Sequence, residues 1–182
     1  ELKGKKVLCR CDFNVPMKDG KITDDFRIVS SLPTVKYLIE QGARVILMSH
    51  MGKPKGEPKP ELSLGPVALR LTELLGQEVK FISCPTVISD SVREMAEGLS
   101  DGEVMLLENT RYRAEETKSE EPFTGELASL GELFVNDAFG TAHRDHSSTA
   151  GIARYLPTVS GFLIEKEVKF LGDALDKPER PF

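Results

Sequence analysis

Four short segments of the sequence carry polar and basic side chains directly after apolar runs. They are DFN after VLCRC, SHMGK after ARVILM, ENTRYR after VMLL, and NDAFGTAHRDH after LFV. Together with Arg27, on the long connection after the first run, they supply Asp12, Asn14, His50, Lys53, Arg111, Arg113, His143 and Arg144. Guanidinium groups can bond two oxygens of a phosphate or carboxylate at once. In a chain with a formal charge of −5, so many cations in these segments indicate an anionic ligand.

Each segment also has a purely structural interpretation. Asp12 and Asn14 could form an Asx turn, in which a side chain bonds its own backbone two residues on. His50 could be a hydrogen-bonded residue at a strand end, and Arg111 and Arg113 could pair with the acidic run EETKSEE. No segment decides between these interpretations alone, and the anionic-site hypothesis depends on their shared placement after strands.

Other functions are weaker alternatives. His143 and His146 lie three residues apart, and with Asp137 they could serve a metal hydrolase. Arg144 lies between the two histidines and no helix is indicated to hold their spacing, so we expect no metal ligands. The rival class is a non-enzymatic domain that senses a phosphorylated metabolite, or a receiver phosphorylated on Asp12. A receiver needs clustered acidic residues for magnesium, whereas these segments are basic.

The elements that must position these residues follow an alternation of strand and helix patterns. We predict strands in the run that starts at Val7 and at residues 43–49, 79–82, 104–108 and 133–137, and helices near residues 63–75, 89–97 and 124–130 and after Ile164. Another helix is expected in SSLPTVKYLIEQG, capped by Ser30 or Ser31, with Pro33 in its first turn and Gly42 at its end. The alternation predicts an α/β fold, a doubly wound, Rossmann-like parallel sheet with helices on both faces. Such sheets bind ligands beyond the carboxyl ends of their strands, where the four segments lie.

The composition argues against several other classes of function. The negative charge disfavours nucleic acid and membrane surfaces, and no apolar run approaches the roughly 18 residues of a membrane span. Three cysteines at these spacings suit the reduced thiols of a cytoplasmic protein. The chain contains no G-x-x-x-x-G-K-[ST], G-x-G-x-x-G or G-x-S-x-G motif, so neither a nucleotide phosphate loop nor a serine nucleophile is indicated.

The segments CDFNVP, ITDDFRI, SHMGKPKG, LLENTRY and NDAFGTAHRDHSST, in this order, resemble the N-terminal domain of the phosphoglycerate kinase family. The resemblance covers essentially the whole chain and implies that residues 1–182 are one domain of a two-domain kinase. In that family the N-terminal domain binds 3-phosphoglycerate and the C-terminal domain binds the magnesium nucleotide. The enzyme moves a phosphoryl group between 1,3-bisphosphoglycerate and ADP. By the resemblance we expect the nucleotide-binding domain to follow Phe182, and this fragment to be inactive without it.

The family pattern also implies roles for individual residues. It assigns to substrate binding Asp12, Phe13, Asn14, Arg27, His50, Met51, Gly52, Lys53, Arg111 and Arg144, with Asp12 and Asn14 at the hydroxyl and His50, Arg111 and Arg144 at the non-transferred phosphate. Arg27 is the implied catalytic residue and faces the transferring phosphoryl group. Where the family commonly has His-x-Gly-Arg, this chain has Lys53, which keeps the charge but loses the bidentate fork.

The resemblance implies Mg-ATP or Mg-ADP as the nucleotide of the C-terminal domain, with no cofactor and no metal held by this chain. The implied partners are 3-phosphoglycerate, 1,3-bisphosphoglycerate and the chain's own C-terminal domain. We expect a cytoplasmic monomer that binds neither nucleic acid nor membranes.

Overall fold

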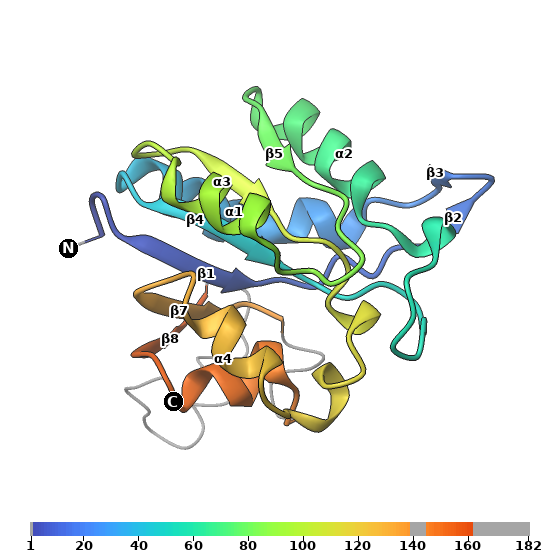
Figure 1. Cartoon of the computed structure of the whole chain (residues 1–182). Helices are drawn as coiled ribbons and strands as arrows, with labels where there is room; N and C mark the ends of the chain where they lie inside the picture. Colours follow the sequence, from blue (N-terminus) through green and yellow to red (C-terminus); the bar gives the residue numbers. More distant parts are fainter. Residues whose placement is uncertain (1, 139–144, 162–182) are drawn as a thin grey trace, which may run out of the picture.

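A six-stranded sheet forms the centre of the chain in the computed structural model, which describes residues 2–138 and 145–161 (Figure 1). The strands are β1 (Lys6–Arg10), β4 (Arg44–Met48), β5 (Val79–Phe81), β6 (Val104–Leu106), β7 (Leu133–Asn136) and β8 (Thr158–Ser160). Their order is β5-β6-β4-β1-β7-β8, and every neighbouring pair is parallel. The chain therefore builds outward from β1 in both directions, and the predicted doubly wound α/β fold is confirmed.

Helices cover both faces of this sheet. They are α1 (Phe26–Glu40), α2 (Gly65–Leu75), α3 (Asp90–Glu97) and α4 (Phe123–Ala128). Successive strand residues point to opposite faces, so Val7 and Cys9 of β1 pack in the core layer of α1 and α2. Leu8, between them, packs in the second layer with residues of α3 and α4. Figure 1 shows α2 above the sheet and α4 below it.

Helix α1 begins about one turn before the predicted start. Its N-cap is Asp25, and the backbone N–H of Phe26 donates to the Asp24 carboxylate, so the acidic pair starts the helix instead of Ser30 or Ser31. Pro33 lies inside α1, not in its first turn. A proline there removes the hydrogen bond to the carbonyl of the residue four positions earlier, Val29, which is 41% exposed. The predicted end at Gly42 holds, since α1 stops at Glu40.

The remaining predicted helices and strands within the described ranges are present, with ends shifted by two residues or fewer. Elements that the sequence patterns do not predict are β8, the short hairpin of β2 (Met17–Lys18) and β3 (Lys21–Ile22), the 3₁₀ turns η1 (Pro60–Leu62), η2 (Thr110–Tyr112) and η3 (Glu116–Lys118), and the π-helical turn η5 (Ser147–Gly151). The helix predicted after Ile164 lies outside the described residues. None of the described helices has both the length and the apolar character that crossing a membrane requires.

Candidate functional site

The loop after β1 contains the Asx turn and is also bonded to the loop after β4. The backbone N–H of Asn14 donates to Asp12 Oδ1 at 3.1 Å, which orients the carboxylate at the strand end. The backbone N–H of Phe13 donates to Ser49 Oγ at 2.9 Å, and the Phe13 side chain is fully buried. The Asx turn and the ligand-binding hypothesis are therefore compatible, because the turn fixes the Asp12 carboxylate in the position where a ligand would contact it.

Arg27 reaches this loop from the first turn of α1, not from an irregular connection as predicted. Its Nη1 donates to the Asn14 carbonyl at 2.7 Å and lies 3.6 Å from Asp12 Oδ1. The Arg27 side chain is 52% exposed and that of Asp12 is 24% exposed, so solvent reaches both partners. A cavity of about 410 Å³ opens beside them, lined by Asn14, Val15, Pro16, Asp24, Phe26 and Arg27.

The turn after β4 is bonded to the loop after β1 through Gly52. Gly52 has a φ of +61°, and an added Cβ would lie 2.8 Å from Leu62 Cδ2, so both the backbone and the space at this turn favour glycine. Its backbone N–H donates to Asn14 Oδ1 at 2.9 Å. Since this bond uses the amide oxygen, the Nδ2 hydrogens of Asn14 are its groups for donating to a ligand.

Asn109, at the end of the loop after β6, holds the third segment against this turn. Its buried side chain accepts from the backbone N–H of Met51 at 3.2 Å and donates to the Met51 carbonyl at 2.8 Å. The same Oδ1 accepts from the backbone N–H of Arg111. Arg111 Nη1 in turn donates to the Gly52 carbonyl at 3.4 Å. Asn109 was not a predicted site residue, although its place two residues after the apolar run VMLL is a usable signal.

His50 is buried and contacts the buried guanidinium of Arg10. Its Nδ1 is 2.6 Å from Arg10 Nη2, and Arg10 Nη1 contacts Glu116 Oε2 at 3.3 Å and Ser148 Oγ at 2.5 Å. Arg10 and Glu116 are fully buried, and His50 is 6% exposed. Burial lowers the pKa of Arg10, and the nearby Glu116 carboxylate opposes that shift. Arg10 was not a predicted site residue, although a lone arginine inside VLCRC is unusual for a buried strand.

Arg113 pairs with the acidic run that follows it, as its purely structural interpretation expects. It bonds both oxygens of Glu115, at 3.2 and 2.9 Å, and also contacts Glu126 and the Thr86 carbonyl. Its guanidinium lies 4.6 Å from the centre of the Phe123 ring. Burial lowers the pKa of Arg113, but the hydrogen bonds to Glu115 and Glu126 outweigh that effect and raise it overall. Arg113 therefore belongs to a structural cluster with Glu115, Glu126 and Phe123, and its guanidinium is engaged there and not in the anion-binding group.

The structure thus brings together Asp12, Asn14, Arg27, Gly52 and Arg111, with His50 adjoining them. Phe13 and Met51 have buried side chains and take part through their backbones. Lys53 follows Gly52 with an exposed side chain. His143 and Arg144 lie outside the described residues. Within the described ranges, no group of three or more histidine, cysteine or acidic residues is placed to hold a metal ion.

Comparison with known proteins gives consistent matches. The model of the phosphoglycerate kinase family matches residues 1–182. A phosphoglycerate kinase of Clostridium botulinum (strain Eklund 17B / Type B) is 64% identical over 183 residues, and one of Clostridium perfringens (strain 13 / Type A) is 61% identical. Each alignment covers 100% of this chain and 46% of the relative, so the chain spans about half the length of the curated relatives it matches.

Solved structures of whole enzymes show the same fold. The phosphoglycerate kinase of Coxiella burnetii superposes with a TM-score of 0.84 and that of Pyrococcus horikoshii OT3 with 0.85, each at 40% identity. These alignments cover 98% of this chain and 44% and 45% of the two structures. The match of the family model over the full sequence and these superpositions lead to one conclusion: the chain belongs to the phosphoglycerate kinase family.

Proposed function

We propose that this chain is the 3-phosphoglycerate-binding domain of a phosphoglycerate kinase, a glycolytic enzyme that converts 1,3-bisphosphoglycerate and ADP into 3-phosphoglycerate and ATP. The observation that carries the proposal is the bonded group of Asp12, Asn14, Arg27, Gly52 and Arg111. It unites an acceptor for a hydroxyl, an amide donor and two guanidinium groups at the carboxyl edge of one sheet. A small phosphorylated hydroxy acid has the groups that match this set.

Within this proposal, Asp12 accepts a hydrogen bond from the substrate hydroxyl and Asn14 donates through Nδ2. Arg111, His50 and Arg144 bind the phosphate that is not transferred, and Lys53 adds positive charge nearby. The backbones of Phe13, Met51 and Gly52 hold the loops at their relative positions. Gly52 fixes the direction of the Asn14 amide and accepts a bond from Arg111, so it couples the hydroxyl side of the site to the phosphate side.

Arg27 is the proposed catalytic residue. Phosphoryl transfer needs little covalent chemistry from the protein, and the main contribution is a positioned cation that stabilises charge developing in the transition state. The bond from Nη1 to the Asn14 carbonyl holds one edge of the guanidinium. Nε and Nη2 can then donate to the oxygens of the transferring group without loss of that anchor.

The nucleotide is assigned to the C-terminal domain, because the residues of this chain include none of the glycine-rich phosphate loops that bind nucleotides. Bound there, magnesium nucleotide supplies the phosphoryl acceptor and neutralises phosphate charge. This chain binds and orients the acid, and its principal protein partner is its own C-terminal domain. A cytoplasmic monomer without nucleic-acid or membrane partners completes the proposal.

Binding is tested by thermal unfolding and calorimetric titration of the chain with 3-phosphoglycerate. A ligand that binds only the folded state stabilises it by about 2.7 kcal/mol at a hundredfold excess over Kd. Glycerate and inorganic phosphate serve as control ligands, and we expect both to bind far more weakly. The matched control variant is Arg93→Ala, which removes an exposed arginine paired with Asp90 on α3. A melting temperature that does not respond to millimolar 3-phosphoglycerate contradicts the proposal.

Catalysis is tested by joining the chain to a nucleotide-binding domain of the family. The chain alone should transfer no phosphoryl group from ATP to 3-phosphoglycerate, because donor and acceptor oxygens are not brought in line. In the joined enzyme, Arg27→Ala should lower kcat more than it raises KM, since its contact strengthens as charge develops. Turnover by the chain alone that disappears in its Arg27→Ala variant would show that the nucleotide site is in this domain.

A further inference from the structure

We propose that Arg10 is a positioning residue of the anion site, which acts by holding the ring of His50 with its proton on Nε2. This inference rests on the proposed function, because it concerns the histidine assigned to the substrate phosphate. Arg10 lies at the end of β1, two residues before Asp12, and its side chain is fully buried. It needs no contact with the substrate to have this effect.

The direction of the bond between Arg10 and His50 decides which ring nitrogen carries the proton. Arg10 Nη2 lies 2.6 Å from His50 Nδ1. A guanidinium has only donors, so Nδ1 must be the acceptor in this bond and cannot carry a hydrogen. A neutral imidazole with an accepting Nδ1 has its proton on Nε2. Any phosphate oxygen that accepts a hydrogen bond from His50 must therefore do so at Nε2.

A second set of contacts keeps Arg10 itself in place. Its Nη1 donates to Glu116 Oε2 and to Ser148 Oγ, whereas its Nη2 contacts His50, so each end of the guanidinium meets a different part of the protein. Glu116 is held in turn by Thr110 Oγ1 at 2.8 Å and by the backbone N–H of Ser148 at 3.0 Å. These contacts therefore connect η2, η3 and η5 to His50 through one arginine, Arg10, at the end of β1.

The cost of this arrangement argues that it serves more than stability. Burying a charged pair is frequently no better for stability than burying apolar residues of the same size. Arg10 Nε is also buried and has no hydrogen-bond partner in the described part of the chain. An unsatisfied buried donor costs further free energy. A planar fork that reaches His50 with one nitrogen and Glu116 with another provides the orientation that an apolar residue cannot.

The backbone of His50 is fixed as well as its ring. Ser49 Oγ donates to the His50 carbonyl at 2.9 Å and accepts from the backbone N–H of Phe13. On the other side, Asn109 bonds both backbone groups of Met51. With the main chain held on both sides, the contact of Arg10 Nη2 with His50 Nδ1 restrains the orientation of the ring.

The direct test is ¹⁵N NMR of the imidazole groups in the labelled chain at neutral pH, without ligand. The chain has three histidines, and His50→Gln identifies the signals of His50 by their absence. We expect His50 to show a protonated Nε2 and an unprotonated Nδ1. The variant Arg10→Met/Glu116→Gln removes both buried charges together, so that neither is left unpaired. In this variant we expect signals of mixed protonation states for His50.

Binding of 3-phosphoglycerate supplies the second readout through a double-mutant cycle. Arg10→Met/Glu116→Gln should weaken binding about tenfold, on the scale of one charge-assisted hydrogen bond. In a His50→Ala background the same change should weaken binding less than about twofold, because a positioning residue has nothing left to position. Arg10→Lys keeps the charge but loses the planar fork, so it should bind 3-phosphoglycerate less tightly than the unsubstituted chain. His50→Gln, which retains a donor near the place of Nε2, should bind better than His50→Asn.

Two results would overturn the inference. One is a proton on Nδ1 of His50 in the unsubstituted chain, or no change in its signals when Arg10 is replaced. The other is an equal loss of binding with and without His50, which would mean that Arg10 acts by another route. A chain that shows the expected His50 signals but does not bind 3-phosphoglycerate would refute the proposed function instead, so the two failures are distinguishable.

Discussion

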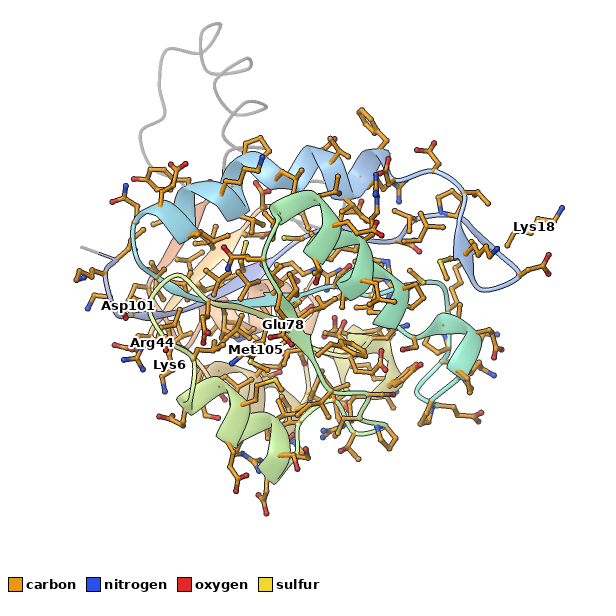
Figure 2. The ribbon with its side chains drawn as sticks, turned by 90° about the horizontal axis from the view of Figure 1, so that it is seen from above. Lys6, Lys18, Arg44, Glu78, Asp101 and Met105 are labelled. Carbon is orange, nitrogen blue, oxygen red and sulfur yellow. The ribbon has the colours of Figure 1, made fainter. Side chains whose placement is uncertain are left out.

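The two edges of the parallel sheet hold their cations in different ways. At the amino edge, Lys6 of β1 and Arg44 of β4 are partners in the strand register, and in Figure 2 they lie on the same side of the view as Asp101, opposite Lys18 of the hairpin. Lys6 Nζ lies 2.5 Å from Glu97 Oε2, and Arg44 Nε lies 3.7 Å from Asp101 Oδ1. The side chains of these two acids are 70% and 41% exposed. Such exposed pairs restrain their partners little.

At the carboxyl edge, cations are held by backbone carbonyls and by buried groups. Arg27 and Arg111 donate to the carbonyls of Asn14 and Gly52, and Arg10 is enclosed with Glu116. A carbonyl on a fixed turn positions a guanidinium more closely than a flexible carboxylate does. The carboxyl edge therefore differs from the amino edge in how firmly its charged groups are positioned, more than in how many charges it has.

The largest effect should come from breaking the buried pair. Arg10→Met leaves the Glu116 carboxylate buried without its cation, which should lower the free energy of unfolding by about 3–5 kcal/mol. Lys6→Met at the amino edge should change it by less than about 1 kcal/mol. Urea denaturation monitored by circular dichroism measures both. Recovery of most of the lost stability in Arg10→Met/Glu116→Gln is expected, and failure to recover would mean that the loss reflects packing around the arginine.

The next effect should appear in ligand affinity. If Arg111 binds the phosphate as proposed, Arg111→Ala removes a charge-assisted hydrogen bond and should weaken 3-phosphoglycerate binding about 10- to 100-fold. Arg44→Ala removes an arginine from the other edge of the sheet and should leave binding unchanged. Isothermal titration of the two variants under identical salt gives the comparison. Similar losses in both would show that general positive charge attracts the ligand, without a positioned site.

A smaller effect should follow from adding one methyl group at the turn after β4. Gly52→Ala forces a left-handed backbone conformation on alanine and pushes its Cβ against Leu62, so stability should fall by about 1–2 kcal/mol. Gly20→Ala is the matched control, because Gly20 has a φ of +77° but no atom within 4 Å of the added carbon. Denaturation should show a greater loss for Gly52. Weaker ligand binding should accompany it, because Gly52 orients Asn14.

Much of this architecture is predictable from local patterns. Apolar runs of strand length and helical repeats identify the central strands and the helices, because burial on both faces leaves a strong signal. The meeting of Asp12, Gly52 and Arg111 also follows, since the carboxyl ends of parallel strands lie at one edge of the sheet.

The remaining features depend on contacts between distant residues. Arg10 and Glu116 are 106 positions apart, and no local pattern indicates that they pair. Arg111 and Arg113 look alike in the sequence, yet Arg113 pairs with Glu126, which α4 brings to it, whereas Arg111 donates to the Gly52 carbonyl. The start of α1 was misplaced because two capping signals compete, and the acidic pair before Phe26 precedes the serines.

The smallest effect should be the pH response of the amino edge. The hydrogen bond and charge of Lys6 lower the pKa of the Glu97 carboxyl in the folded chain. A carboxyl with a lower pKa when folded stabilises the protein above its unfolded value of about 4.3, and this contribution disappears as the pH falls through the folded pKa. Glu97→Gln should therefore melt slightly below the unsubstituted chain at pH 7, and the difference should vanish under strongly acidic conditions. Thermal melts across this range provide the measurement, with 3-phosphoglycerate affinity at pH 7 as the control. A difference that grows on acidification would contradict the pairing, and a change in affinity would contradict the separation of the two edges.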